Sequence, residues 1–416
     1  MFVALNTAVE EATMDGCDVV GINLEHYELC HPNLSGYCLP SGNSVSSHLS
    51  NLAISHGQFS HRKLAQSATE YVDLEICSGR LLLPQEQGYN AGLLQEQVDS
   101  FTLRRLSLLM THAHLRHCNL CPRLCGVNRY ERSGFCLIGA ETVKVNVISP
   151  HFGEEPCIQG HNGSGSVFFS GCNLRCVFCQ NHDIAHQRKG FDLTPEELAD
   201  WMIKLQDVGE VHNINFVTPE HVVPQVALAI LRGREIGLKV PIIYNTSAFD
   251  SLDSLELMDG LVDVYLPDLK TWHKETGKRL LKAVNYTETA LESIKAMYKQ
   301  VGDLIFTGDG IAKKGLLVRH LVMPGKEDEG VAIMKWLAQS ISKDTFVNIM
   351  EQYHPDAHVG KKKRGPSQPR GMSEDLRYAD INRAVTADEV GAVTKAAREA
   401  GLWRFAEAAK HGGFNL

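Results

Sequence analysis

From about residue 163 onward, short apolar runs alternate with segments in which hydrophobic residues recur at helical spacing. Apolar runs of this length, bounded by turn residues, predict β-strands. The six predicted strands cover Ser166–Ser170, His212–Thr218, Val240–Thr246, Leu261–Leu266, Leu316–Met323 and Phe346–Met350. Because strands that alternate with helices favour parallel β/α units, the pattern predicts an α/β fold. Six repeats make a partial (β/α)6 barrel, an open version of the (β/α)8 barrel, in which chemistry lies at the carboxyl ends of the strands.

Capping motifs and apolar faces predict the helices between these strands. Thr194–Glu197 and Thr386–Glu389 each place a Thr three residues before a Glu, which is the pattern of a capping box. Behind the first box, one apolar helical face is expected to pack against the sheet through Leu198, Trp201, Met202 and Leu205. Further helices are expected from Pro219 towards Arg234, from Thr287 to Gln300, and after the fifth strand. The last of these carries Val331, Met334, Leu337 and Ile341.

The chain before the barrel divides into two parts. Residues 1–110 are expected to form an irregular N-terminal extension, with a helix over about 93–110 and no assigned role. Its scattered cysteines, Cys17, Cys30, Cys38 and Cys77, lack ligand spacing. Residues 114–160 are expected to form a cysteine-rich metal-binding module, and residues 161–405 the barrel.

Composition narrows the classes of protein to which the chain can belong. Hydrophobic residues make up 44% and charged residues 22% of the 416 positions, as in ordinary soluble proteins. With a net charge of −8, nothing in the charge balance points to nucleic acid or an anionic membrane as a partner. No apolar run approaches the length of about 18 residues that spans a membrane, and the start lacks a targeting pattern. We therefore expect a cytoplasmic protein, in which the cysteines hold metals rather than form disulfides.

Three cysteines directly follow the first predicted strand: Cys172, Cys176 and Cys179. Thiolates are soft ligands that suit iron–sulfur clusters or zinc. Because a [4Fe–4S] cluster usually takes four cysteines, three local ligands would leave one iron open to a small molecule. The alternatives are buried structural cysteines and a zinc knuckle that lacks its fourth ligand. Gly171 allows a sharp turn, and polar residues separate the cysteines, so a metal-binding loop is favoured over a core element.

A second group of cysteines precedes the barrel: Cys118, Cys121, Cys125 and Cys136. Four thiolates in so short a segment suit a tetrahedral zinc site or a second iron–sulfur cluster. Pro122 and Gly126 supply turns between them. The alternative is a set of reduced, packed thiols, and packing is the preferred interpretation for the nearby Cys157.

The cysteine triad and its surroundings, Gly165–Asn181, resemble the radical S-adenosylmethionine (SAM) enzymes. Further stretches resemble the uncharacterised branch of that superfamily that is similar to pyruvate formate-lyase activating enzyme: Cys121–Arg129, Asn213–His221, Tyr244–Thr246, Asp263–Lys270, Arg319–Gly325 and Asn348–Tyr353. The resemblance implies a [4Fe–4S] cluster on the triad, with SAM at the open iron. Reductive cleavage of SAM would then yield a 5′-deoxyadenosyl radical that abstracts hydrogen from a substrate. In such enzymes the protein positions the cofactors and excludes competing reactions.

The resemblance also implies roles for individual residues. The expected cofactor-binding residues are Phe178, Thr218, Asn245 and Thr246, and the expected catalytic residues are Asp268, Lys270, Arg319 and His320. Phe178 matches the aromatic position that contacts adenine. Activating enzymes usually carry Gly-Gly-Glu after the second strand, whereas this chain has Val217–Glu220, in which the Thr218 hydroxyl could accept from the SAM ammonium. For the charged residues, strand-end salt bridges are the alternative role.

Several functions remain open at the level of sequence. The leading one is a radical SAM enzyme, an oxidoreductase or a glycyl-radical-activating type, supplied by a low-potential electron donor such as flavodoxin or ferredoxin. The alternatives are radical modification of another protein, peptide or RNA, and a non-catalytic metal-binding scaffold. The basic run Lys361–Arg364 is interpreted as a solvated, mobile loop, although such runs also occur in nucleic-acid patches.

Overall fold

The structure is a computed structural model that describes residues 114–362 and 376–406, together with short strands before residue 82. The chain divides into two compact units, Met1–Ala113 and His114–Leu416. In the first unit, one antiparallel sheet contains β1 (Val9–Met14), β2 (Cys17–Asn23) and β3 (Tyr71–Asp73), and a second pairs β4 (Ile76–Cys77) with β5 (Arg80–Leu81). The helix predicted over 93–110 lies outside the described residues.

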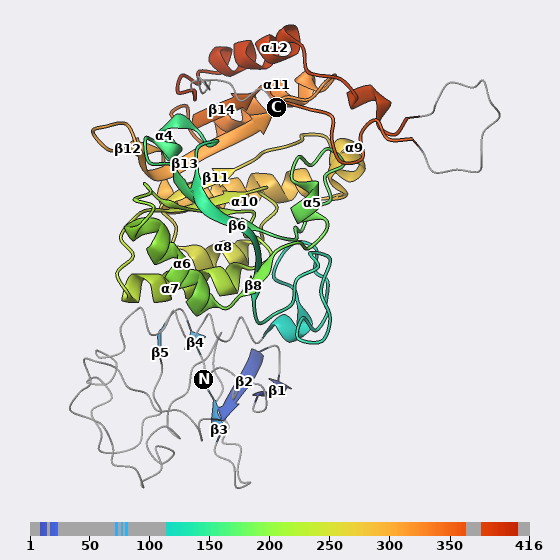
Figure 1. Cartoon of the computed structure of the whole chain (residues 1–416). Coiled ribbons are helices and arrows are strands. Elements are labelled where there is room, and N and C mark those ends of the chain that lie inside the picture. Colours follow the sequence, from blue (N-terminus) through green and yellow to red (C-terminus); the bar gives the residue numbers. More distant parts are fainter. Residues whose placement is uncertain are drawn as a thin grey trace, which may run out of the picture. The chain divides into compact units, whose positions relative to one another are not determined.

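Six parallel strands form the centre of the large sheet of the second unit (Figure 1). In spatial order they are β7 (Ser164–Phe169), β9 (Ile214–Val217), β10 (Ile242–Thr246), β11 (Val264–Pro267), β13 (Ala312–Leu321) and β14 (Phe346–Met350). Three antiparallel strands extend it: β6 (Val143–His151) beside β7, β8 (Phe191–Leu193) beside β6, and β12 (Ile305–Phe306) beside β13. Among the described strands β8 and β14 do not pair, so the predicted open, partial barrel is confirmed.

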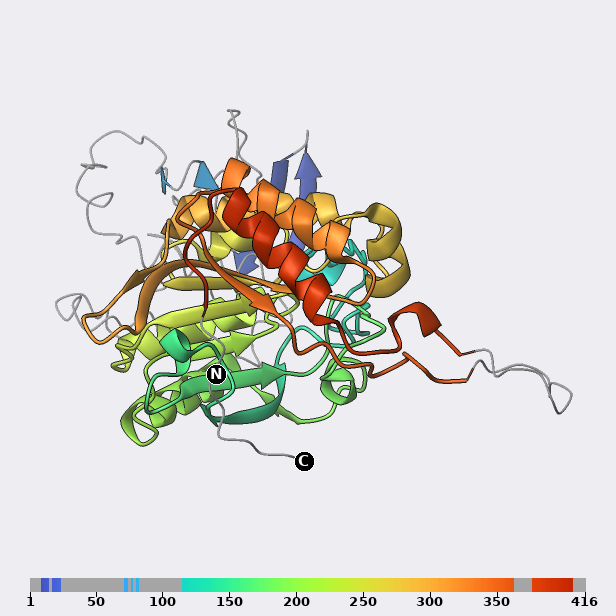
Figure 2. The ribbon, with the colours of Figure 1, turned by 90° about the horizontal axis from the view of Figure 1, so that it is seen from above.

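Each parallel strand is followed along the chain by a helix: α6 (Pro195–Asp207), α7 (Val223–Glu235), α8 (Leu252–Met258), α10 (Tyr286–Val301), α11 (Glu327–Ser340) and α12 (Ala387–Glu399). Figure 1 shows α6, α7, α8 and α10 along one part of the sheet. In Figure 2, α11 and α12 lie side by side. Shorter turns are η3 (His114–His117), α4 (Pro156–Gln159), α5 (His182–Ala185), α9 (Lys274–Thr276), η4 (Gly277–Leu281) and η5 (Ala379–Ile381).

Both predicted capping boxes are present. The Thr194 hydroxyl accepts from the Glu197 amide, and the Glu197 carboxylate accepts from the Thr194 amide. The same reciprocal pair joins Thr386 and Glu389 at the start of α12. These bonds satisfy amides that have no partner inside the first helical turn, which is why the helices begin where the pattern predicts.

Three local predictions about the helices are wrong. Trp201 is 36% exposed and lies under the Lys204 ammonium instead of packing in the core, because it falls at the edge of the apolar face of α6. Helix α7 begins at Val223 rather than at Pro219, since Thr218 has a left-handed φ of 62° and a turn follows it. Ile341 caps the end of α11 and is not part of the helix.

The two faces of the sheet carry different structures. Side chains alternate along a strand, and Tyr244 and Tyr265 point towards the helices, where Tyr265 donates to Gln300 of α10. Ile243, one residue from Tyr244, points to the inner face and packs in a cluster with Ile158 of α4. The segment that ends in α4 therefore covers the inner face and brings the residues just before it, Glu154 and Glu155, into the barrel.

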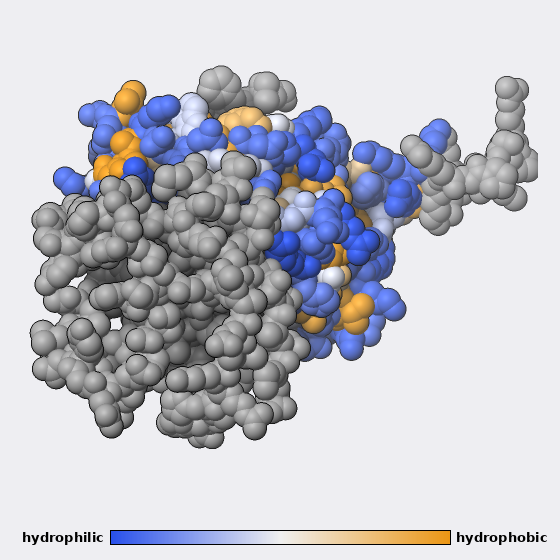
Figure 3. All heavy atoms as spheres, turned by 90° about the horizontal axis from the view of Figure 1, so that it is seen from below, coloured by the Kyte–Doolittle hydropathy of each residue, from blue (hydrophilic) through white to orange (hydrophobic). Residues whose placement is uncertain are grey.

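The described surface fits a polar exterior. On the face shown in Figure 3, the visible described residues are mostly hydrophilic, with isolated hydrophobic spots. Among the residues described, no helix has the length and apolar character needed to cross a membrane. In the predicted basic loop, Lys361 and Lys362 are described, and the residues from 363 to 375 lie outside the described part.

Candidate active site

The carboxyl ends of three adjacent strands bring polar side chains together on the inner face. Asn245 lies on β10, Asp268 directly follows β11, and Arg319 lies on β13. Asp268 and Arg319 also form a parallel β-bridge. Because parallel strands all end at the same edge of the sheet, residues far apart in the sequence meet at this point.

Arg319 is the centre of this group. Its Nε donates to Asp268 Oδ1 at 2.7 Å, and one terminal nitrogen donates to Asn245 Oδ1 at 2.7 Å. The other terminal nitrogen lies 3.4 Å from Glu154 Oε2 and 3.9 Å from Glu155 Oε1. A guanidinium can make all of these contacts because it presents five N–H groups in a fixed plane.

The charges of the group stabilise one another. Burial raises the pKa of Asp268, but the nearby charges of Arg319 and Lys270 outweigh burial and hold that pKa below its usual value. The Lys270 ammonium donates to Asp268 Oδ2 at 2.6 Å. Burial lowers the pKa of Lys270, yet the Asp268 carboxylate brings it above the usual value. Asp268 is therefore ionised and Lys270 protonated across the physiological range.

Glu154 and Glu155 join the group from the segment before α4, and no sequence pattern had singled them out. Burial raises the pKa of Glu154 to about 7, although Arg319 opposes this shift. Glu155 Oε1 accepts from the Asn348 amide at 2.8 Å, whereas its Oε2 is buried without a hydrogen-bond partner. Asn215 lies beside Glu154 with an amide that makes no hydrogen bond of normal geometry. The inner face thus holds buried acceptors that a ligand with hydrogen-bond donors could satisfy.

The remaining predicted residues do not join the Arg319 group. His320 points to the opposite face of β13, where its Nδ1 lies 2.8 Å from the Leu269 carbonyl oxygen. Thr246, likewise, points away from Asn245. Phe178 is 6% exposed and packs near Tyr353, with ring centres 6.0 Å apart. Their expected roles in cofactor binding or catalysis stay predictions.

Thr218 occupies the turn where activating enzymes usually have glycine. Its φ of 62° lies in the left-handed region, which is rare for a β-branched residue and costs of the order of 1–3 kcal/mol. The Thr218 amide donates to the Asn245 carbonyl oxygen at 2.8 Å, and this bond ties the turn to the next strand. The chain therefore keeps a backbone shape that glycine would adopt without strain.

Beside this turn lies a buried acid pair that the sequence analysis did not identify. Glu220 Oε1 accepts from the amide of Ser247 at 2.6 Å and from its hydroxyl at 2.7 Å. The Thr246 hydroxyl lies 2.8 Å from Glu220 and 2.6 Å from Asp250. Burial raises the pKa of Glu220 and raises that of Asp250 to about 8. The Thr246 hydroxyl can donate to only one of these carboxylates at a time. A proton on either acid would supply the second hydrogen bond.

The three cysteines of the triad lie in the loop after β7. Cys172 and Cys176 are buried, Cys179 is partly exposed, and all three are free thiols. Burial raises the pKa of each thiol, and the charges of Cys176 and Cys179 add to the shift at Cys172. The Leu174 amide approaches Cys172 Sγ at 3.3 Å. Lys270 lies near enough to Cys176 to interact with its charge, which connects this loop with the Arg319 group.

The spacing of these thiols can be compared with two kinds of centre. Within residues 114–362 and 376–406, no three His, Cys, Asp or Glu side chains converge as ligands of a single metal ion. Ligands of one tetrahedral zinc, with bonds of about 2.3 Å, would stand roughly 3.8 Å apart. Cysteines of a [4Fe–4S] cluster bind different irons and stand further apart. Three soft donors on one loop are of the kind that an iron–sulfur cluster takes.

The second set of cysteines is also brought together. Burial raises the pKa of Cys121 to about 12, and Cys136, Cys118 and Cys125 each add to this shift. The Phe135 amide approaches Cys125 Sγ at 3.4 Å. Amide-to-sulfur contacts of this kind tune thiolate ligands. Which metal, if any, these four thiols hold stays a prediction.

Arg123 joins the two cysteine sets. Its Nε donates to the carbonyl oxygen of Asn173 in the triad loop at 2.5 Å, and its guanidinium lies near enough to Cys121 and Cys172 to interact with both. A second cation, Arg129, is buried and donates to the carbonyl oxygen of His221 at 2.9 Å. The cysteine-rich segment therefore packs directly against the strand ends.

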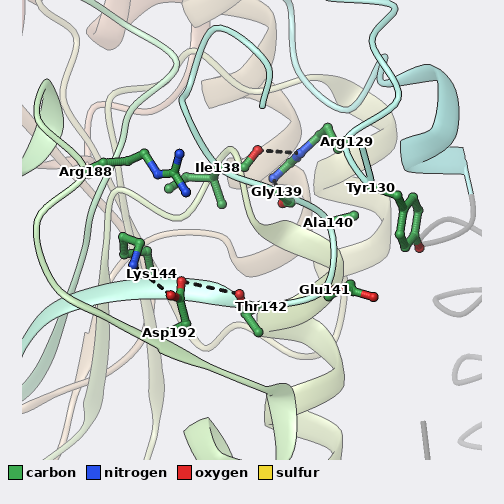
Figure 4. Close-up of a pocket in the computed structure, with 10 residues that line it drawn as sticks. All are labelled: Arg129, Tyr130, Ile138, Gly139, Ala140, Glu141, Thr142, Lys144, Arg188 and Asp192. Atoms are coloured by element: carbon green, nitrogen blue, oxygen red, sulfur yellow. Dashed lines mark hydrogen bonds and ion pairs between the residues drawn. The ribbon is translucent and has the colours of Figure 1, made fainter. Parts of the chain in front are cut away.

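A separate pocket of about 220 Å³ lies between the cysteine-rich segment, β6 and β8 (Figure 4). The Lys144 ammonium pairs with Asp192 at 2.9 Å, and Arg188 lies at the same pocket. None of the residues of the Arg319 group or of the triad lines it. This pocket is therefore not the candidate active site.

The fold and the site define a class: open β/α barrels with a three-cysteine loop after the first parallel strand. Residues 166–337 match the sequence profile of the radical SAM superfamily, so this part of the chain is a radical SAM domain. It is 29% identical over 287 residues to the uncharacterized protein MJ0674 of Methanocaldococcus jannaschii, covering 66% of this chain and 72% of that protein.

Two solved structures are also similar in part. A domain of pyruvate-formate lyase-activating enzyme from Bacteroides vulgatus has a TM-score of 0.29 at 11% identity, covering 43% of this chain and 87% of that chain. SuiB of Streptococcus suis bound to S-adenosylmethionine has a TM-score of 0.37 at 13% identity, covering 58% of this chain and 48% of that chain.

A radical SAM domain implies a [4Fe–4S] cluster and SAM. When bound, they would supply a carbon-centred radical through the reductive cleavage of SAM. Cys172, Cys176 and Cys179 are the residues that would hold the cluster, because they are the neighbouring thiols at the active-site edge. Arg319, Asn245 and Asp268 bring together a guanidinium, an amide and a carboxylate. Groups of this kind can bind the carboxylate and the ammonium of an amino acid. Asn245 is buried, and the side chains of Arg319 and Asp268 are 15% and 18% exposed, so the group is largely but not fully shielded from water.

Proposed function

We propose that this radical SAM enzyme abstracts hydrogen from a carbon of a macromolecular substrate, with activation of a glycyl radical enzyme as the first candidate. The observation that carries the proposal is the hydrogen-bonded group of Arg319, Asp268 and Asn245 beside the triad loop. Asp268 and Lys270 belong to the Asp-Leu-Lys stretch that resembles activating enzymes. A non-catalytic scaffold would have no need to keep ionised groups buried next to three free thiols.

A second candidate is radical modification of a different protein or peptide. The replacement of Gly-Gly-Glu by the strained turn at Thr218 supports this alternative. So does the cysteine-rich segment, which packs against the triad loop through Arg123. Both features separate this chain from the activating-enzyme pattern, so the kind of substrate is the open part of the proposal.

The central claim is tested with the anaerobically reconstituted protein. With dithionite and SAM, the parent should form 5′-deoxyadenosine, and the variant in which Cys172, Cys176 and Cys179 are all Ala should form none above background. The matched control is Cys157→Ala, because Cys157 packs against the apolar cluster of the inner face. Formation of 5′-deoxyadenosine by the triple variant at the parent rate would refute the claim.

The kind of substrate is tested separately with pyruvate formate-lyase as the probe. Activation predicts a glycyl-radical signal in electron paramagnetic resonance after incubation with the parent, SAM and dithionite. Cleavage of SAM without that signal would favour the second candidate.

A further inference from the structure

The cysteine-rich segment presents apolar side chains to solvent directly beside its cysteines. Leu124, between Cys121 and Cys125, is 68% exposed, and Phe135, next to Cys136, is 38% exposed. Cys125 is also the one cysteine of this set that is not buried. A single exposed apolar residue is normal on a protein surface, so the side chains around these two decide whether they form a binding surface.

Two cations stack against the Phe135 ring, and a third residue, Lys282, lies next to one of them. The guanidinium carbons of Arg123 and Arg175 lie 4.1 Å and 4.8 Å from its centre. Lys282 is exposed, and its carbonyl oxygen accepts from Arg123 at 2.6 Å. We call Leu124, Phe135 and these three cations the Phe135 face.

The three cations make no ion pair with a carboxylate in the described residues. Arg123 and Arg175 donate to backbone carbonyl oxygens. The Lys282 ammonium donates to the Arg279 carbonyl oxygen at 2.8 Å and to the Tyr378 hydroxyl at 2.9 Å. The whole chain has a net charge of −8, so the Phe135 face is a local excess of positive charge on an acidic protein. Such a patch attracts acidic partners and speeds their association.

The Phe135 face also lies against the candidate catalytic centre. Arg123 bonds to the Asn173 carbonyl oxygen in the triad loop, and Arg175 of that loop donates to the Phe135 carbonyl oxygen at 2.6 Å. A molecule bound on this face would therefore contact residues that belong to both cysteine sets.

We propose that the Phe135 face is the docking surface for a small acidic redox protein that supplies electrons to the enzyme. The proposal rests on the proposed function, because an electron is needed only if the cysteines hold an iron–sulfur centre. In the step, the donor loses one electron and the iron–sulfur centre gains it, with no transfer of atoms. An apolar centre with a polar rim is typical of protein interfaces.

The competing explanation is internal: the cations offset the negative charge of a thiolate-bound centre and bind no partner. Two variants separate the explanations, Leu124→Asp and Lys282→Glu. Asp is tolerated better than most residues at the positive φ of Leu124, 44°. Val208→Asp is the matched control, since Val208 is 82% exposed at the end of α6, where the chain leads into the amino end of β9.

Binding is measured first, in a way that does not depend on catalysis. Calorimetric titration of the reconstituted protein with oxidised flavodoxin should show binding that weakens as salt rises, because screening shortens the range of the charges. We expect the two variants to bind at least tenfold more weakly and the control within twofold of the parent. Titration with an acidic ferredoxin is the second probe. Parent-like binding by both variants, or binding of neither probe by the parent, overturns the proposal.

Turnover is then measured with two reductants. With reduced flavodoxin, Leu124→Asp and Lys282→Glu should form 5′-deoxyadenosine at least tenfold more slowly than the parent, whereas with dithionite they should stay within twofold. Equal losses with both reductants would instead support the internal role of the cations. If the parent makes no product with dithionite, the proposed function fails, and the calorimetric titration still decides whether the face binds an acidic redox protein.

Discussion

At the scale of single residues, Arg319 shows how one side chain can organise a site. Its hydrogen bonds reach Asn245 on β10 and Asp268 just after β11, and it approaches the carboxylate of Glu154 in the segment before α4. Removing one partner from such a buried, charged set leaves the others unpaired, which is more costly than the loss of an exposed pair.

We predict that Arg319→Lys weakens SAM binding. One ammonium cannot take the place of a planar guanidinium that serves several acceptors at once, so we expect the Kd for SAM to rise about tenfold, or about 1.4 kcal/mol. Calorimetric titration of the reconstituted protein measures this. Arg232→Lys is the control, because Arg232 lies on the exposed surface of α7 and pairs with Glu235. A parent-like Kd in Arg319→Lys would leave Arg319 with a structural role only.

Thr218 illustrates the opposite case. Its side chain differs from the glycine that activating enzymes usually have there, but its backbone keeps a conformation that glycine adopts. The sequence shows only that glycines are absent after the second strand. The structure shows Thr218 at φ 62°, tied to Asn245 by a backbone hydrogen bond. Side-chain identity alone could not reveal this, because a strained conformation is maintained by its neighbours.

At the scale of elements, the period of the hydrophobic residues and the caps determine most of the helices and strands. β14 covers the predicted residues Phe346–Met350, and α12 begins directly after the predicted cap at Thr386. Helix α8 and strand β6 were not predicted. α8 is short, and β6 has only a partial alternation of buried and exposed residues, so neither has a strong periodic signal.

We predict that Thr386→Ala destabilises the protein by about 1 kcal/mol, the usual effect of losing a helix cap. The Thr386 hydroxyl accepts from the Glu389 amide, and Glu389 in turn accepts from the Gly325 amide at 2.6 Å. The change therefore affects both the start of α12 and its attachment to the turn after β13. Thermal unfolding should show a midpoint lower by a few degrees.

The control for this change is Lys395→Ala on the same helix, where the lysine side chain is 76% exposed and pairs only with Glu399. Its midpoint should stay within about a degree of the parent value, since exposed pairs contribute little. Equal effects of the two changes would mean that the cap is not what stabilises the start of α12.

At the scale of the whole molecule, the second cysteine set raises the question of a second centre. Cys118, Cys121, Cys125 and Cys136 lie in a segment that contains only one short helical turn, η3, before β6. Such a segment has little core of its own, and metal binding can supply the missing folding free energy.

We predict that these four cysteines hold a metal distinct from the catalytic cluster, and more specifically a second iron–sulfur cluster. Metal and sulfide analysis of the variant lacking Cys172, Cys176 and Cys179 decides between the alternatives. Residual iron with sulfide supports the second cluster, and stoichiometric zinc would mean a structural site. The absence of both would show that the four cysteines are packed thiols.

The sequence by itself determined the open β/α barrel and the two groups of cysteines. These depend on local signals: the spacing of apolar residues, the capping boxes, and soft ligands close together in the chain. The placement of Asn245, Asp268 and Arg319 at one edge also followed from the sequence, because parallel strands end on the same side.

Only the tertiary structure decided which polar residues meet. His320 and Thr246 lie beside predicted site residues in the sequence but point to the other face of their strands, because side chains alternate. Glu154 enters the Arg319 group because Ile158, a few residues later, packs into the inner face. Contacts of this kind depend on how distant segments pack against one another, and no local pattern of residues encodes them.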